Sequence, residues 1–121
     1  MTNTKKFNLL LDDVRTLNEV YEMTKDIDYK NNEWIIAEDY HEFIKLIEDK
    51  YKQNSILPEI ISFDHDIGED YTGKDCAKWF IDFCIDNNLQ IPKIKIHSMN
   101  PIGKQNIANL FSDYQRYINK V

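Results

Sequence analysis

Acidic and histidine residues occur at three places in the sequence, each directly after a short apolar run. The runs end in Asp12-Asp13, in Asp64-His65-Asp66 and in His97. Grouped carboxylates bind hard divalent cations, and histidine exchanges protons near neutral pH. Such side chains together can polarise a phosphate ester and move the protons that its hydrolysis requires. The sequence therefore predicts one reactive centre, provided that the fold brings the three places together.

The apolar runs have the length and composition of strands buried on both faces of a sheet. Segments with apolar residues at helical spacing alternate with them. The predicted strands are 7–11, 34–37, 59–63 and 94–96, and the predicted helices cover about 40–51, 73–86 and 101–118. This alternation predicts a three-layer α/β fold with a small, mostly parallel, Rossmann-like or flavodoxin-like sheet. We expect a single domain over 1–121 and the strand order 2-1-3-4.

Residues 14–33 carry the weakest pattern in the chain. Leu17, Val20 and Tyr21 predict a short helix. The residues from 28 to 33 are mostly polar, and we expect a loop there.

The strand order predicts where a ligand binds. Open parallel sheets bind ligands beyond the carboxyl ends of their strands, at the point where the strand order reverses. In the order 2-1-3-4 this point lies between the first and third strands. Those strands end in Asp12-Asp13 and Asp64-His65-Asp66, and the neighbouring fourth strand ends in His97. We therefore expect the three stretches to meet in one crevice.

Packed carboxylates need a compensating positive charge, and a divalent cation commonly supplies it. The predicted ligands of such a cation, magnesium or manganese, are Asp12, Asp13 and Asp64. The alternative for Asp12-Asp13 is that the pair only begins a turn, where Asp is common. A metal-free mechanism that uses the histidines alone also remains open.

His65 and His97 are the predicted general acid and base, in an unassigned order, with Asp64 and Asp66 as catalytic carboxylates. The alternative for each histidine is a structural side chain bonded to a neighbouring carboxylate. His41 opens a predicted helix elsewhere, and we expect it at the surface.

The start of the last predicted helix has the features of an anion site. Asn100 is an N-cap type residue before Pro101, and the free N–H groups of a helix start attract phosphate. Arg15 could clamp a phosphate or pair with the acidic residues before it. The alternative for the helix start is an ordinary cap. The predicted substrate-binding residues are Arg15, Ser98, Asn100, Gly103 and Asn106. The polar stretch 68–73 is either a lid over the crevice or a plain connector.

The bulk properties exclude several classes of function. The net charge of −6 argues against direct DNA binding, so we expect a small phosphorylated ligand as the partner. No apolar stretch is long enough to span a membrane, and the polar start of the chain predicts no signal peptide. We therefore expect a cytoplasmic protein. Cys76 and Cys84 fall near the apolar stripe of one helix, where we expect reduced core thiols.

Four stretches resemble the cyclic-phosphate-processing receiver-like domains, small proteins of bacteria and their viruses. They are LLLDDVR (9–15), ISFDHDIG (61–68), GKDCAKWF (73–80) and HSMNPIGKQNI (97–107). The resemblance covers residues 7 to about 114. It implies a receiver-like fold that acts as a phosphoesterase on cyclic phosphates from nucleotide, ADP-ribose or RNA metabolism. The motif positions of the family fall on Asp12, Asp13, Arg15, Asp64, His65, Asp66, His97, Ser98, Asn100 and Asn106.

Two other functions remain open. A phosphoacceptor receiver would be phosphorylated on Asp64, but such receivers resemble one another in a lysine at the position that Asn100 occupies here. A non-catalytic module would bind a nucleotide or a partner protein without turnover.

Overall fold

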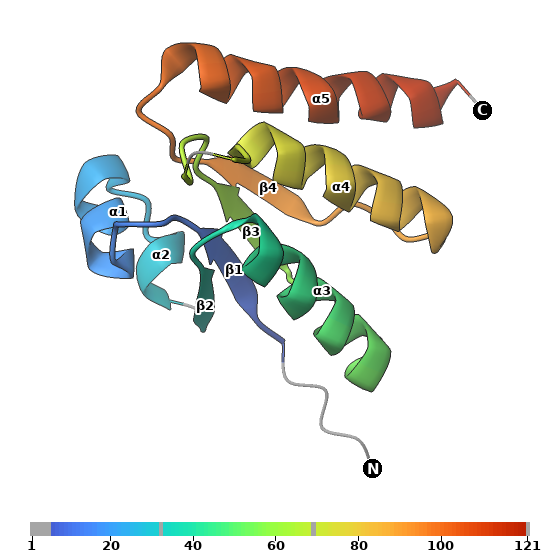
Figure 1. The fold of residues 1–121 in the computed structure, drawn as a ribbon, viewed down its shortest axis with the longest axis horizontal. Coiled ribbons are helices and arrows are strands. Elements are labelled where there is room, and N and C mark those ends of the chain that lie inside the picture. Colours follow the sequence, from blue (N-terminus) through green and yellow to red (C-terminus); the bar gives the residue numbers. More distant parts are fainter. Residues whose placement is uncertain (1–5, 32, 69, 121) are drawn as a thin grey trace.

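A parallel sheet of four strands in the order β2-β1-β3-β4 lies at the centre of the molecule (Figure 1). The computed structural model describes residues 6–31, 33–68 and 70–120. The strands are β1 (Asn8–Leu11), β2 (Trp34–Ala37), β3 (Ile60–Phe63) and β4 (Lys93–Ile96). The helices are α1 (Leu17–Thr24), α2 (Asp28–Asn31), α3 (Tyr40–Asn54), α4 (Gly73–Asp86) and α5 (Pro101–Asn119). The predicted fold class and strand order are confirmed.

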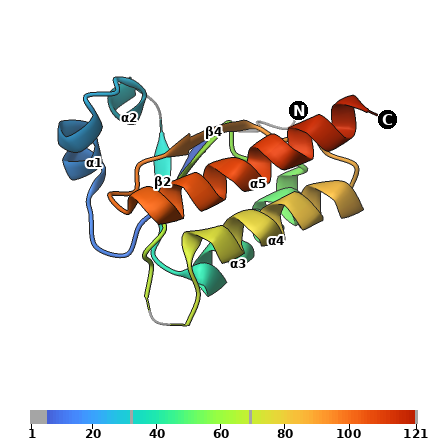
Figure 2. The same cartoon turned by 90° about the horizontal axis from the view of Figure 1, so that it is seen from above.

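The two faces of the sheet carry different helices (Figures 1 and 2). Because side chains alternate along a strand, Leu9 and Leu11 point to one face and Leu10 to the other. Leu9 and Leu11 belong to the larger apolar core, which includes buried residues of α3, α4 and α5. Leu10 packs with Val20 and Tyr29 in a smaller cluster under α1 and α2. The short helices therefore cover the face that points away from the main core.

The prediction of a loop at 28–33 is wrong, because α2 forms there. Tyr29 is buried and stacks on Trp34 with ring centroids 5.1 Å apart. The indole N–H of Trp34 donates to the carbonyl of Asp28 at 3.0 Å, and Lys93 pairs with the Asp28 carboxylate at 3.2 Å. These tertiary contacts, made to two strands, stabilise a helix that its own short sequence does not predict. The predicted short helix before it is confirmed as α1.

The N-terminal caps that the sequence predicts for α4 and α5 are both formed. Thr72 and Asp75 make a capping box at the start of α4. Asn100 caps α5, where its Oδ1 accepts the backbone N–H of Gly103 at 3.0 Å. These caps fix the directions in which α4 leaves the end of β3 and α5 leaves the end of β4.

Cys76 and Cys84 are buried free thiols, as predicted. Burial raises the pKa of the Cys84 thiol to about 12, which keeps this thiol protonated and unreactive. No helix of the described part of the chain is long and apolar enough to cross a bilayer. The segment on which the signal-peptide prediction rests lies largely outside the described residues, which begin at Lys6.

Candidate functional site

Asp12, Asp64 and His97 are the first residues after three neighbouring strands. Leu11 pairs with Phe63 in the sheet, and the ladder continues one step further. The N–H of Asp64 donates to Leu11 O and the N–H of His97 donates to Phe63 O, both at 3.0 Å. Because the three residues are in register, their side chains point to the same face. One polar atom from each of the three side chains lies within 4.8 Å of the other two, so the three stretches converge as predicted.

Asp12 is a buried carboxylate that accepts four hydrogen bonds. Its Oδ1 accepts the backbone N–H groups of Val14 at 3.0 Å and Arg15 at 2.8 Å. Its Oδ2 accepts from His97 Nε2 at 3.0 Å and from Arg15 Nη1 at 3.2 Å. Burial alone raises the pKa of Asp12, but the hydrogen bonds from His97 and Arg15 outweigh it and hold the pKa well below its usual range. Asp12 is therefore a fixed anion.

Asp64 lies beside Asp12, but its pKa is shifted in the opposite direction. Its Oδ1 accepts only the backbone N–H of His65 at 2.8 Å, and its Oδ2 lies 3.4 Å from Arg15 Nη1. Burial and the negative charge of Asp12 raise the pKa of Asp64, against the opposing effects of His97 and Arg15. A pair of carboxylates whose pKa values are pushed apart is typical of sites that exchange protons.

Arg15 lies between the two carboxylates. Its Nη1 is 3.2 Å from Asp12 Oδ2 and 3.4 Å from Asp64 Oδ2, so it pairs across the site with both. Its side chain is 26% exposed. Within the described residues, Nη2 and Nε make no hydrogen bond, so these donors are available to a phosphoryl oxygen.

His97 is sealed inside the molecule, because its side chain is 0% exposed. Its Nδ1 lies 2.7 Å from Ser62 Oγ, and Ser62 Oγ lies 2.6 Å from the hydroxyl of Tyr29. Sequence reasoning missed both hydroxyl residues. Ser62 gave a signal, as a polar residue inside an apolar run, whereas Tyr29 was hidden in the segment predicted to be a loop.

His65 is the more accessible histidine of the site, with a side chain 16% exposed. Its Nδ1 lies 3.1 Å from Asp66 Oδ1, and its Nε2 makes no hydrogen bond within the described chain. Its ring lies against Gly103, where a Cβ would overlap the imidazole. The space beside Gly103, which we predicted for a ligand, is thus filled by the His65 ring. Asp66 acquires a defined place as the partner of His65.

The other predicted binding residues lie around this core. Asn100 Nδ2 reaches Asp66 Oδ2 at 3.4 Å, and the Asn100 N–H donates to Ser98 Oγ at 3.1 Å. Asn106 is half-buried in α5, and its side chain makes no hydrogen bond within the described residues. Asp13 is also half-buried but is not in the group of Asp12, Asp64 and His97.

The residues expected to hold a divalent cation could bind one only if Arg15 moved away from Asp12 and Asp64. Arg15 already lies between Asp12 and Asp64, and the Asp12 carboxylate is occupied by four donors. His97 Nε2 completes the group by distance, but this atom faces the Asp12 carboxylate at 3.0 Å. A nitrogen that donates a hydrogen has no lone pair for a metal. A cation would therefore have to replace Arg15.

A pocket of about 480 Å³ opens beside the site, between α1, α2 and the start of α5. His97 and Ser98 line it on one side, Met23 and Tyr29 on the other, and Lys104 at its rim. Lys104 is exposed and pairs with no acidic side chain of the described chain. The pocket has the size of a small-ligand site and carries one available cation.

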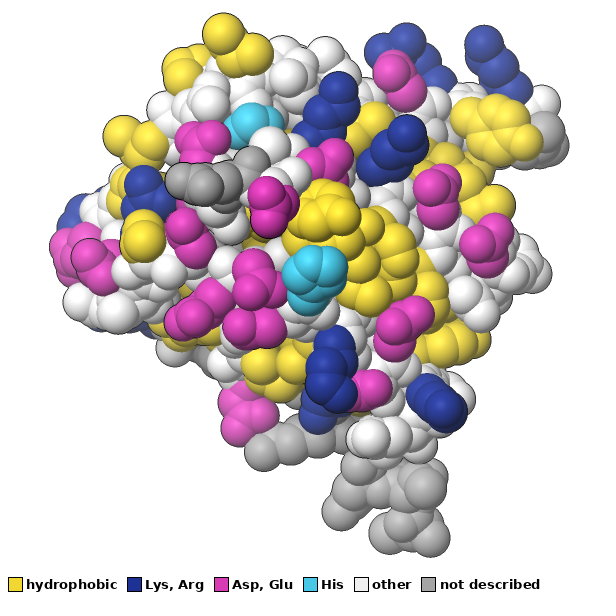
Figure 3. Space-filling view, in the orientation of Figure 1, with side chains coloured by type: hydrophobic (Ala, Val, Ile, Leu, Met, Phe, Trp, Pro, Cys, Tyr) yellow, Lys and Arg dark blue, Asp and Glu magenta, His cyan; other side chains and the backbone are white. Residues whose placement is uncertain are grey.

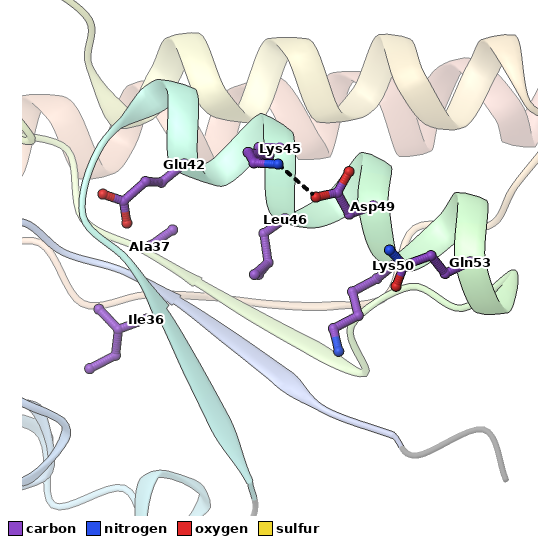
Figure 4. Close-up of a pocket in the computed structure, with 8 residues that line it drawn as sticks. All are labelled: Ile36, Ala37, Glu42, Lys45, Leu46, Asp49, Lys50 and Gln53. Carbon is purple, nitrogen blue, oxygen red and sulfur yellow. Dashed lines mark hydrogen bonds and ion pairs between the residues drawn. The ribbon is translucent and has the colours of Figure 1, made fainter.

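Acidic side chains gather on the left of the space-filling view (Figure 3). The strands run toward this side in the same orientation (Figure 1). A second pocket, of about 340 Å³, lies between the edge strand β2 and α3 (Figure 4). It is lined by Ile36 and Leu46, and its Lys45 is paired with Asp49 at 3.1 Å. This pocket holds none of the predicted site residues.

The stretch 68–73, predicted as a lid or a connector, is held at two points, and Glu69 lies outside the described residues. Tyr71 stacks on Tyr40 with ring centroids 4.0 Å apart, and Thr72 bridges to Asp66. His41 is exposed, as expected, and packs edge-on against the two tyrosine rings.

Comparison with known proteins places most of the chain in one family. The family model described as "Cyclic-phosphate processing Receiver domain" matches residues 7–113. No curated protein and no solved structure matches the chain. The match spans all four strands and the whole of the site described above.

Proposed function

Since the chain belongs to the cyclic-phosphate-processing receiver family, we propose that it is an enzyme that hydrolyses a cyclic phosphate where β1, β3 and β4 end. One observation carries this proposal. The Arg15 guanidinium is anchored between two carboxylates by a single nitrogen, and its remaining donors have no partner among the described residues. Arg15 can therefore bind two phosphoryl oxygens without leaving Asp12 and Asp64.

His65 is the proposed base. Asp66 accepts the Nδ1 hydrogen of His65, which leaves the Nε2 lone pair available for a water molecule. The water oxygen forms a bond to phosphorus and gives its proton to Nε2. One ring P–O bond breaks, so that the product is a phosphate monoester with a free hydroxyl.

Asp64 is the proposed acid that protonates the leaving oxygen. Burial and the negative charge of Asp12 raise the pKa of Asp64, which favours its protonated form, whereas the pKa of Asp12 is lowered. Asp64 is also within contact distance of Arg15, so the proton donor and the phosphate anchor lie together. His97 is a member of the same site.

A divalent cation is the part of the proposal that the contacts favour least. Asp12 and Asp64 would hold it in place of Arg15, where it would neutralise phosphoryl charge. The Arg15 guanidinium and a divalent cation would each balance the charge of Asp12 and Asp64. We therefore propose that magnesium or manganese competes with Arg15 for these two carboxylates.

The pocket beside His97 and Ser98 is the proposed place for the organic part of the substrate, a nucleotide, ADP-ribose or RNA-derived fragment. Ser98 and Lys104 are among the residues that line this pocket. Asn100 and Asn106 would complete the polar wall.

A substrate screen tests the proposal. Purified protein is incubated with 2′,3′-cyclic nucleotides, 3′,5′-cyclic nucleotides and ADP-ribose 1″,2″-cyclic phosphate, with and without magnesium or manganese. Phosphorus NMR separates cyclic diesters from monoesters. We expect one class to be opened to a monoester. Unchanged ligand that co-purifies or binds tightly would instead support the non-catalytic binding module.

A further inference from the structure

A buried chain of hydrogen bonds runs from α2 across the sheet into the site. The distances are 2.6 Å from Tyr29 Oη to Ser62 Oγ, 2.7 Å from Ser62 Oγ to His97 Nδ1 and 3.0 Å from His97 Nε2 to Asp12 Oδ2. Each of these four residues, which we name the inner chain, is at most 3% exposed. Each polar side-chain atom along the inner chain is therefore hydrogen-bonded to the next, and these partners determine where the hydrogens lie.

The carboxylate at the end of the inner chain sets the direction of every bond. Ionised Asp12 can only accept, so His97 Nε2 must carry a hydrogen. In a neutral imidazole Nδ1 then accepts, and the Ser62 hydroxyl must donate to it. The Ser62 oxygen in turn accepts from the Tyr29 hydroxyl, and burial raises the pKa of Tyr29, which keeps that donor protonated.

Reversing the hydrogen bonds of the inner chain would leave the Tyr29 hydroxyl without an acceptor among the described residues. If Nδ1 of His97 also carried a hydrogen, Ser62 would accept it and donate to Tyr29 instead. The Tyr29 hydroxyl hydrogen would then have no acceptor among the described residues, since Ser62 is its sole hydrogen-bond partner there. A buried donor without an acceptor destabilises the arrangement that contains it.

We propose that Tyr29 and Ser62 are positioning residues that hold His97 as the neutral Nε2–H tautomer. In this form His97 fixes Asp12, which fixes Arg15, and His97 does not exchange protons with the substrate. The catalytic consequence rests on the proposed function, whereas the tautomer does not. Proton exchange is thereby assigned to the outer residues Asp64 and His65.

The anchoring of α2 supports this assignment. Tyr29 is delivered by a four-residue helix, which is too short to be stable alone. Lys95 pairs with Asp26 and Asp28, and Trp34 stacks on Tyr29. These contacts keep the Tyr29 hydroxyl within hydrogen-bond distance of Ser62 Oγ, as a positioning role requires.

Nitrogen NMR of histidine-labelled protein at pH 7 tests the tautomer directly. The His97 signals are identified by their loss in His97→Gln. We expect one-bond N–H coupling at Nε2 and an unprotonated, hydrogen-bonded Nδ1. Coupling at Nδ1, alone or together with Nε2, would overturn the proposal, whether or not the protein has any activity.

Variants of the inner chain test its function. Tyr29→Phe should shift the Nδ1 signal and lower kcat by about 10- to 100-fold with little change in KM, as expected of a group that orients a site. Tyr21→Phe is the matched control, because Tyr21 packs against the same apolar cluster and its hydroxyl makes no hydrogen bond within the described residues. Equal kinetics for both variants would contradict a positioning role.

His97→Gln and His97→Ala separate positioning from acid–base chemistry. Gln retains a side-chain N–H that can donate to Asp12, but it cannot exchange a proton near neutral pH. We expect His97→Gln to keep at least ten times the turnover of His97→Ala. Equal, near-complete losses would assign proton transfer to His97. A wild type inactive on every cyclic phosphate would count against the proposed function and leave the NMR result to judge the tautomer.

Discussion

His97 Nε2 donates a hydrogen bond to Asp12 Oδ2 over 3.0 Å, and neither side chain is exposed to solvent. This bond joins the end of β4 to the end of β1 across β3. His97 and Asp12 form the fixed inner part of the site. Asp64 and His65 form the proposed reactive part. Each part makes its own predictions.

Asp12→Asn should lower the free energy of unfolding at pH 7 by about 1.5–3 kcal/mol, the usual worth of hydrogen bonds to a charged group. The pKa of Asp12 is lower in the folded protein than its ordinary value of 3.8. Its stabilisation is therefore present above pH 4 and is lost as the pH falls further. Urea unfolding at pH 7, 5 and 3 measures this. Asp13→Asn is the control, with an expected change within about 0.5 kcal/mol.

Asp64→Asn should have the opposite effect on stability. Because the pKa of Asp64 is raised in the folded state, the ionised group costs stability once the pH rises above its ordinary range. The variant should therefore be as stable as the wild type at pH 7, or more stable, while its turnover falls. A large destabilisation that grows with pH would show that Arg15 depends on the Asp64 charge.

Arg15→Gln should weaken phosphate binding and strengthen cation binding. The substitution removes the guanidinium between Asp12 and Asp64, so two carboxylates are left without their compensating charge. We expect a higher KM for the cyclic phosphate and a measurable magnesium affinity by calorimetry. Arg116→Gln, at an exposed position of α5, is the control. Unchanged magnesium binding in Arg15→Gln would exclude competition between the two cations.

His65→Ala should reduce turnover by about 10²–10⁴-fold, the usual effect of removing a general base. Asp66→Asn should reduce it less, since Asn can still accept the Nδ1 hydrogen of His65. Neither change should unfold the protein, because both side chains lie at the accessible edge of the site. Initial rates on the best substrate and thermal unfolding curves provide the check. Wild-type turnover in His65→Ala would remove this residue from the mechanism.

The sequence predicted the members of the site that follow strands. Asp12, Asp64 and His97 could be found because each directly follows an apolar run. The strand order was chosen from the alternation of strands and helices together with the right-handedness of their connections. The place of Arg15 could not be decided, since the choice among acidic partners depends on side-chain geometry. Tyr29 was missed because α2 is stabilised by contacts with distant strands. Gly103 has a different role from the predicted one, because its missing Cβ makes room for a histidine 38 positions earlier in the chain.

Lys104→Ala should raise KM about tenfold and leave kcat close to that of the wild type. Lys104 lines the pocket beside Ser98 and pairs with no acidic side chain in the described residues, so its charge is available to the substrate. Lys52→Ala, at the far end of α3, is the control. A fall in kcat with unchanged KM would place Lys104 in the chemical step.

Incubation with acetyl phosphate separates the proposal from the phosphoacceptor alternative. Asp64 is buried, and its carboxylate contacts Arg15 and the His65 N–H. We expect no stable aspartyl-phosphate by intact mass spectrometry. A single added phosphate that is lost in Asp64→Asn would instead identify a signalling receiver.

The most direct test of the account is a phosphorus NMR time course of the cyclic phosphate panel with wild type, His65→Ala and His97→Gln in parallel. The proposed mechanism predicts that the wild type converts one cyclic phosphate to its monoester, that His65→Ala is slower by at least a hundredfold, and that His97→Gln loses less of the rate than His65→Ala. No conversion of any cyclic phosphate by the wild type, with or without added cation, would contradict it.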